Sequence, residues 1–424
     1  MGTSQSVTPD TNSRALREPE TGKPLYLTRE LNGRFRMRRI VPLLSLFVLT
    51  ACITAHAVPL KRVNVQEMER LLSAAQGQSD NKVAKLIASV ELTERASAVR
   101  LAKWESEFPG HRCHEAFLLL ADSSAFIDIS AADIPSTPPP DPQAQRTLMG
   151  MTIDYVKTAI NRLPDFYATR RTENFQDMTG RPTSLSRAPD QNSEKVLDTR
   201  DSPHEPFLEA GKSSVTVSYV DGQEVTASKK GGDSFGKPPV ALTTHGEFGP
   251  ILIAILQDAA KGRIYWKQWE EGTNGMFAVF RYSVTQGQSS YQVMLPEATK
   301  NETLFPAYHG EIGVDPATGA ILRISVIADL PPPHQHAISS ILVEYASVAI
   351  GGKSYICPVH GVAMAKFSIP AELRPVNRIE PVLITRFETQ LNDVAFVDYH
   401  QFRAESRVLT DKPIGEPDAP APPK

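Results

Sequence analysis

The sequence has few cysteines, little net charge and no apolar run long enough to cross a membrane. Three cysteines among 424 residues can form at most one disulfide, which excludes a fold built on disulfides. A formal net charge of −3 gives no electrostatic reason to expect nucleic acid as a partner. The apolar run from Ile40 to Ala51 is too short to span a bilayer as a helix. A hydrophobic fraction of 41% is ordinary for a globular protein, so we expect one or two domains with tails.

Metalloprotease and dinucleotide-binding motifs are also missing, because the chain has no His-Glu-x-x-His and no Gly-x-Gly-x-x-Gly. Cys357 and His360 combine a thiol with a base, but residues three apart in a strand point to opposite faces. His334 and His336 supply two imidazoles, whereas a metal site needs three or four ligands. We therefore predict a non-enzymatic protein with no catalytic residue, no metal and no cofactor.

A segment near the N-terminus has the pattern of a bacterial signal peptide. Basic residues between Arg34 and Arg39 precede the apolar run, and Ala55-His56-Ala57 follows it as a small-x-small cleavage site. We predict a signal peptide over residues 37–57, with Met37 as an alternative start of the chain. Residues 1–36 are then an over-called start or a disordered extension. The protein is expected in the periplasm or cell envelope.

A second interpretation of the same segment stays open. Leu49-Thr50-Ala51-Cys52 resembles a lipobox, in which Cys52 would carry a lipid anchor. Membrane attachment is expected only through the signal or this anchor. Cys113 and Cys357 would then be the remaining thiols, in a compartment that permits a disulfide between them. Their positions in the sequence do not decide whether they pair.

Residues 58–132 are predicted to form a helical hairpin or small bundle. Apolar residues recur at helical spacing in four stretches, which we place at Val65–Leu72, Val83–Val90, Leu92–Phe108 and Arg112–Ser123. Ser79-Asp80 is typical of an N-cap ahead of the second stretch. A Pro-rich stretch over residues 133–143 is stiff and extended, so we predict a linker there.

Residues 144–412 are predicted to form a curved, half-barrel-like antiparallel sheet with packed helices, so the expected fold class is α+β. The strongest signal is a hairpin around Asp315–Gly319, where Pro presets φ, Asp bonds its own backbone and Gly takes the left-handed position. Apolar and polar residues alternate along the returning strand to Ala328. We predict a long mobile loop over residues 178–206 and a disordered tail over residues 413–424.

The densest aromatic cluster is the candidate ligand groove. The strand around Phe277–Tyr282 is apolar on both faces, so it is either covered on both sides or lines a cavity. These aromatic residues are sheet core on one interpretation and walls of an apolar groove on the other. The six residues are Trp266, Trp269, Phe277, Phe280, Tyr282 and Tyr291. His245 and Glu247 are the candidate polar pair at the rim of the groove.

The order of helices and strands predicted after the linker resembles that of a known fold. A helix at Gln143–Leu163 runs into a strand, and a second helix at Gly249–Ala260 interrupts an antiparallel meander. This order resembles the half-barrel of lipoprotein carriers and sigma-factor regulators, the LolA/RseB-like superfold. The resemblance implies a curved sheet around a helical plug, with a hydrophobic groove for acyl chains or partner lipoproteins. Several short phrases also resemble a set of exported bacterial proteins of unassigned function, namely Glu91–Arg95, Gly246–Pro250, Trp266–Glu270, Ala278–Tyr282 and Gly313–Gly319.

The leading hypothesis for function is an exported binding protein of the bacterial envelope. It would hold an apolar ligand or a lipoprotein-like partner in the sheet groove. The alternative is a structural or partner-interaction protein that uses the helical segment, which would need a contiguous exposed apolar stripe over Val65–Leu120. A hydrolase with an unrecognised site is the third hypothesis.

Overall fold

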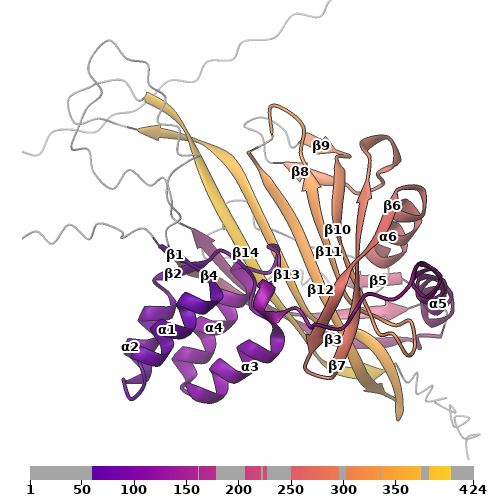
Figure 1. Cartoon of the computed structure of the whole chain (residues 1–424). Helices are drawn as coiled ribbons and strands as arrows, with labels where there is room; N and C mark the ends of the chain where they lie inside the picture. Colours follow the sequence, from indigo (N-terminus) through magenta and orange to yellow (C-terminus); the bar gives the residue numbers. More distant parts are fainter. Residues whose placement is uncertain are drawn as a thin grey trace, which may run out of the picture. The chain divides into compact units, whose positions relative to one another are not determined.

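A ten-stranded antiparallel sheet dominates the structure (Figure 1). The computed structural model describes residues 60–160, 162–177, 206–220, 223–226, 250–295, 302–334, 336–373 and 382–402. These residues belong to one unit, His56–Lys424. Several predictions fall outside the described residues: the extension over 1–36, the signal peptide over 37–57, Cys52, His245, Glu247, loop residues 178–205 and the tail over 413–424.

The sheet is open, and each strand runs antiparallel to its neighbours. In order across the sheet, the strands are β5 (Gln223–Thr226), β4 (Phe207–Val220), β3 (Phe166–Asp177), β14 (Val382–Gln401), β13 (Lys353–Leu373), β12 (Ile338–Ile350), β11 (Ile321–Asp329), β10 (Ala307–Val314), β7 (Gly275–Val284) and β6 (Arg263–Gly272). The predicted α+β class with an antiparallel sheet and packed helices is confirmed.

Register shifts interrupt several of these strand pairs. One lies at Glu344–Tyr345 in β12 and another between Val397 and His400 in β14. An extra residue on one strand increases its local twist and bends it. Strands β13 and β14 curve along their length in Figure 1.

The turn between β10 and β11 has the predicted chemistry. The carboxylate of Asp315 accepts hydrogen bonds from the Ala317 N–H at 3.0 Å and the Thr318 hydroxyl at 2.5 Å. Gly319 has φ +74°, the left-handed conformation that favours glycine. A β-carbon at Gly319 would lie 2.7 Å from the backbone carbonyl carbon of Met151. The turn therefore packs directly against the helix that contains Met151.

Helices α5 (Pro142–Ile160) and α6 (Pro250–Lys261) cover one face of the sheet. Leu148 and Val156 of α5, with Ile255 and Ala259 of α6, share a hydrophobic core with buried side chains of β7, β10, β11 and β12. The carboxylate of Asp141 accepts hydrogen bonds from the N–H groups of Gln143 and Ala144, both at 2.8 Å. Asp141 therefore caps α5, and Pro142 stands where its missing N–H costs nothing.

The helical segment before the linker is confirmed in outline. It contains β1 (Lys61–Val63), α1 (Val65–Ala74), α2 (Asp80–Ile87), β2 (Val90–Leu92), α3 (Ala98–Glu107), α4 (His111–Ser123) and the short 3-10 turn η1 (Ala131–Asp133). Its core includes Trp104 and Phe117, whose ring centroids lie 6.1 Å apart. The Asp80 carboxylate accepts from the Arg112 and Cys113 N–H groups, at 3.2 and 3.0 Å, so it ties the first turn of α4 to α2.

The prediction of a helical stretch over Leu92–Phe108 is wrong for its first residues, because α3 covers only Ala98–Glu107. Residues Val90–Leu92 form β2, which pairs in parallel with β1. Helix α3 begins only after Ser97, whose hydroxyl accepts from the Arg100 N–H at 3.2 Å. Strand β2 is short and is stabilised by pairing with β1, about 30 residues earlier in the chain. The spacing of apolar residues within Leu92–Phe108 therefore gives no sign of this strand.

Helix α4 packs against the sheet on the face opposite α5 and α6. Leu119 and Phe126 contact a cluster that contains Leu342 of β12, whereas the adjacent Val343 belongs to the core under α5 and α6. Consecutive strand residues point to opposite faces, so the sheet is covered by helices on both sides.

A network of ion pairs also joins the helical segment to this face. The side chain of Glu270 is 2% exposed and receives hydrogen bonds from Arg95 at 3.0 and 3.1 Å and from Arg323 at 2.9 Å. Asp128 pairs with Lys267 and Arg281, each at 2.6 Å. Glu311 pairs with the same two cations. We call these seven residues the charged network.

Two smaller features complete the described fold. Strands β8 (Val293–Leu295) and β9 (Glu302–Leu304) form a separate two-stranded sheet after the 3-10 turn η2 (Gln286–Gln288). The predicted linker over residues 133–143 runs beside β6, where the Trp269 indole N–H donates to the carbonyl of Pro138 at 3.0 Å. Among the helices described, none combines the length and apolar character needed to cross a bilayer.

Candidate functional site

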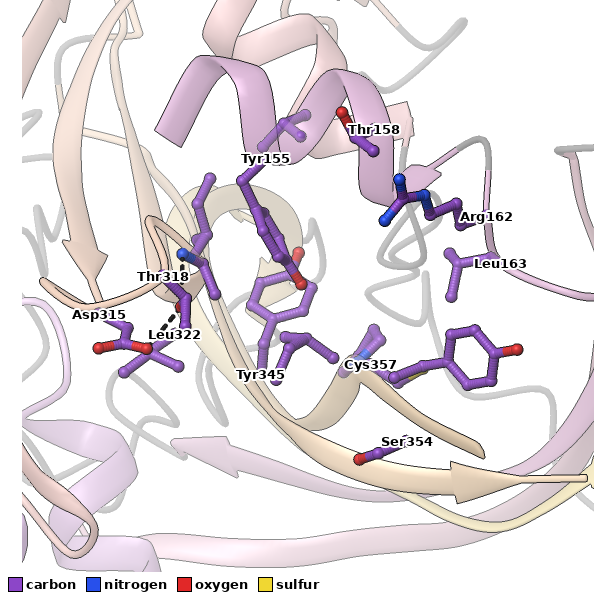
Figure 2. A pocket seen from close by; sticks show the side chains of 16 residues that line it. Tyr155, Thr158, Arg162, Leu163, Asp315, Thr318, Leu322, Tyr345, Ser354 and Cys357 are labelled. Carbon is purple, nitrogen blue, oxygen red and sulfur yellow. Dashed lines mark hydrogen bonds between the residues drawn. The ribbon is translucent and has the colours of Figure 1, made fainter. Parts of the chain in front are cut away.

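The candidate site is a cavity of about 430 Å³ between the C-terminal half of α5 and the sheet (Figure 2). It is formed by α5 and the residues after it, the β10–β11 turn, and strands β11, β12 and β13. The lining residues are Tyr155, Val156, Thr158, Arg162, Leu163, Asp315, Thr318, Ala320, Ile321, Leu322, Tyr345, Ser354, Tyr355, Ile356, Cys357 and Pro358. Most of the wall is aliphatic or aromatic, which is the usual composition of a small-molecule pocket.

The groups deep in this cavity are uncharged. Figure 2 shows the ring of Tyr155 reaching from α5 toward Tyr345 on the sheet, with Cys357 lower in the pocket. Burial raises the pKa of the Cys357 thiol to about 12 and raises the pKa of Tyr155 as well. Both groups are therefore protonated at neutral pH. A protonated, buried thiol is a poor nucleophile, so Cys357 contributes apolar surface here rather than reactivity.

The mouth of the cavity holds one positive group. Arg162 is exposed, and Figure 2 shows its guanidinium beside Thr158, on the side of the cavity formed by the end of α5. Within the described ranges, no carboxylate pairs with it. Asp315, also at the mouth, directs both oxygens into its own turn. The site therefore combines an apolar interior with a cation at its entrance that has no carboxylate partner among the described residues.

The six predicted aromatic residues lie elsewhere, and none lines this cavity. Trp266, Phe280, Tyr282 and Tyr291 belong to or pack against the core under α5 and α6. Trp266 meets Phe280 edge-on with ring centroids 5.5 Å apart, and the Tyr282 hydroxyl donates to the Ser325 carbonyl at 2.7 Å.

The other two aromatic residues also have neighbours that fill their surroundings. Trp269 packs against the same core, meets Trp266 edge-on with ring centroids 4.9 Å apart, and lines a shallow hollow of about 510 Å³ beside the N-terminal half of α5. Phe277 lies on the opposite face of β7, where the Arg323 guanidinium sits 5.2 Å from its ring centroid. Strand β7 is thus covered on both sides. The sequence left open whether it is covered or lines a cavity, and the structure shows the covered arrangement.

The two remaining thiols are not joined. Cys113 and Cys357 are both buried and free, in separate hydrophobic clusters. Burial raises the pKa of Cys113 to about 11. Cys357 belongs to the cluster beside the cavity, whereas His360 faces the carboxylates of the other side, so the two do not form a catalytic pair.

A cluster of possible ligands for a metal was missed by the sequence analysis. Asp122 at the end of α4, His360 of β13 and Asp393 of β14 each place one donor atom within 4.8 Å of the others. Burial raises the pKa of Asp122 well above its ordinary value, although His360 opposes this effect. No local spacing connects residues from three distant elements, so the cluster has no sequence signal.

Comparison with known proteins gives no neighbour: no family model, no curated protein and no solved structure matches the chain. The half-barrel resemblance to lipoprotein carriers and sigma-factor regulators therefore stays a prediction.

Proposed function

We propose that this protein binds a small amphipathic molecule with an apolar body and an anionic group, in the cavity between α5 and the sheet. The observation that supports this is the cavity itself, about 430 Å³ with a mainly apolar wall. Its volume falls in the lower part of the range typical of ligand pockets. Arg162 at the mouth supplies a partner for a carboxylate or phosphate group.

Export to the bacterial envelope is part of the same proposal. The signal pattern over residues 37–57 and the lipobox at Cys52 support it from the sequence. Intact mass spectrometry of protein from its native envelope tests it. A mature chain that starts at Val58, or at Cys52 with a diacylglycerol-type addition, agrees with export. An uncleaved chain held in the membrane agrees with anchoring through the signal, whereas an uncleaved chain recovered from the cytosol contradicts export.

The alternative of a partner-interaction protein has less support. It needs a contiguous apolar stripe on the helical segment, but the exposed large apolar side chains described between Val65 and Leu120 are Val99 and Leu118. The apolar residues of this segment instead form its own core and contacts to the sheet.

The hydrolase alternative also has less support. One Gly-x-Ser-x-Gly sequence, Gly232-Asp233-Ser234-Phe235-Gly236, lies outside the described residues. In hydrolases this motif joins a strand to a helix, whereas here Pro238-Pro239 follows it. Consecutive prolines remove backbone donors and disfavour a helix at that point.

Ligand binding is tested with cis-parinaric acid, a fluorescent fatty acid. We expect saturable binding at one site, with dodecanoate as a competitor. Thr158→Trp fills the mouth from an exposed position on α5 and should abolish binding. Asp154→Trp adds the same bulk at an exposed position of α5 outside the cavity lining and should bind normally. Equal binding by both variants would contradict this site.

The role of Arg162 is tested by a charge comparison. Arg162→Gln should weaken dodecanoate competition roughly fivefold, because an exposed ion pair has a modest energy. The same variant should leave dodecanol competition unchanged, since dodecanol has no charge. An equal loss for both competitors would mean that Arg162 shapes the cavity and does not recognise an anion.

A further inference from the structure

One oxygen of a buried carboxylate at the end of α4 has no hydrogen-bond partner among the described residues. The side chain of Asp122 is 3% exposed, and its Oδ2 atom has none within the described part of the chain. Asp122 is the penultimate residue of α4, where the helix carries partial negative charge. Burying an anion there is costly unless a cation lies beside it.

The atoms around this carboxylate converge on one point. His360 Nε2 lies 3.5 Å from Asp122 Oδ1 and 3.2 Å from Asp393 Oδ1, yet it makes no hydrogen bond to either. Ligand bonds of ~2.1 Å in a tetrahedral site separate neighbouring donor atoms by about 3.4 Å. The two separations from His360 Nε2 therefore match donors arranged around a shared ion, and all three donor atoms lie within 4.8 Å of one another.

The far side of the imidazole has the partner that a metal-bound histidine needs. His360 Nδ1 lies 3.1 Å from Glu344 Oε2 on the neighbouring strand β12. A histidine that ligates a metal usually donates its other N–H to a carboxylate, which fixes the ring and the tautomer. With Glu344 as the acceptor of an Nδ1–H, the Nε2 lone pair faces Asp122 and Asp393, where an ion would bind.

The site has a surplus of negative groups and access to solvent. Three carboxylates, those of Asp122, Asp393 and Glu344, surround the single imidazole of His360. A divalent ion between Asp122 and Asp393 adds positive charge where these groups meet. The His360 and Asp393 side chains are 28% and 18% exposed, which leaves a route for the ion from solvent.

We propose that Asp122, His360 and Asp393 form a binding site for a divalent transition-metal ion of the Zn²⁺ or Mn²⁺ type. One imidazole and two carboxylates suit these ions, whereas Mg²⁺ and Ca²⁺ prefer oxygen ligands alone. The ion joins α4 to β13 and β14, so it couples the helical segment to the sheet. It lies on the sheet face opposite the α5 cavity and is independent of ligand binding there.

The test uses untagged, chelator-treated full-length protein titrated with Zn²⁺ or Mn²⁺ by calorimetry and thermal unfolding. We expect one equivalent bound and a rise of several degrees in Tm, because a ligand of the folded state stabilises it. Mg²⁺ should give neither. His360→Gln and Asp393→Asn should abolish the rise, and Glu344→Gln should weaken binding about 10- to 100-fold. His309→Gln, an exposed histidine paired with Asp329, is the matched control and should behave as wild type.

A spectroscopic measurement keeps the proposal testable if the variants do not fold. Co²⁺ bound to wild-type protein should give visible d–d bands that one equivalent of Zn²⁺ removes. Absence of these bands together with an unchanged Tm would overturn the proposal, in favour of a protonated His360 between the carboxylates. Unchanged metal binding in His360→Gln or Asp393→Asn would equally overturn it.

Discussion

Glu270 connects the two parts of the described chain through a single carboxylate. It is held between Arg95 of the helical segment and Arg323 of the sheet, whose side chains are 13% and 9% exposed. A buried ion pair adds little net stability compared with apolar side chains, but removing one member leaves a buried charge uncompensated. The contribution of this residue is therefore best measured by its removal.

Glu270→Gln should destabilise the protein by about 3 kcal/mol, because Arg95 and Arg323 lose their nearest counter-charge and only Glu311, 3.6 Å from Arg323, remains beside them. Urea unfolding at pH 7 measures this loss. Glu91→Gln is the matched control, since Glu91 pairs with Arg62 at 3.7 Å on the surface. That variant should lose less than about 1 kcal/mol. Similar losses in the two variants would contradict a buried role for Glu270.

The same carboxylate predicts an acid-sensitive stability. Burial by itself raises the pKa of Glu270, but Arg323 and Arg95 outweigh it and lower the pKa from 4.5 to about 2. A lowered folded-state pKa means that the stabilisation is complete above pH ~4.5 and is lost as pH falls toward 2. Urea midpoints measured from pH 5 to pH 2 should fall more steeply for wild type than for Glu270→Gln. Parallel curves would contradict the assignment.

Among the elements, α5 has the largest effect on the candidate site. It is capped by Asp141, it provides the cavity wall from Tyr155 to Thr158, and the β10–β11 turn packs against its backbone at Met151. The position of α5 relative to the sheet therefore sets the width of the cavity. Gly319 lies at this contact, facing the backbone of Met151 and Thr152.

Gly319→Ala should lower the stability of the folded protein by more than backbone strain alone would. Its left-handed φ costs an alanine roughly 1–2 kcal/mol, and the added β-carbon also collides with the Met151 carbonyl. Gly352→Ala is the control, because φ is +83° there and nothing lies within 4 Å of an added β-carbon. Thermal unfolding and cis-parinaric acid binding should both be more impaired in Gly319→Ala. Equal effects would mean that the turn does not support α5.

Local elements were predictable where the causes are local. The Asp315–Gly319 turn and the start of α6 at Pro250 follow from dihedral preferences and side-chain bonds within a few residues. The candidate site was not predictable in this way. The dense group of aromatic residues around Trp266 and Phe280 was the predicted ligand groove. In the structure these large side chains pack in the hydrophobic core instead. The cavity is the space left between α5, the β10–β11 turn and β13. Its position depends on how these distant segments pack together, which no local pattern in the sequence records.

At the scale of the whole described unit, the helical segment and the sheet should unfold together. Trp104 reports on the helical core, whereas Trp266 and Trp269 report on the sheet, and these are the 3 tryptophans of the chain. Urea unfolding curves of Trp104→Phe and of the double variant Trp266→Phe/Trp269→Phe should show one transition each. In each variant, tryptophan fluorescence and far-UV circular dichroism should give the same urea midpoint, as expected for two-state behaviour. Separate transitions in either variant would mean that the charged network does not couple the parts.

The pairing of β3 with β14 has a consequence for synthesis of the chain. Phe166 pairs with Gln401 and Asp177 with Thr389, so the first strand of the large sheet is completed by the last. During translation, β3 to β5 leave the ribosome with the inner edge of β3 unpaired, and β6 to β13 follow with the edge of β13 unpaired. Open strand edges invite pairing with other chains, and such non-local contacts form slowly. A chain terminated before residue 382 would contain two sheet fragments and no strand to join them, which makes truncated products prone to aggregation.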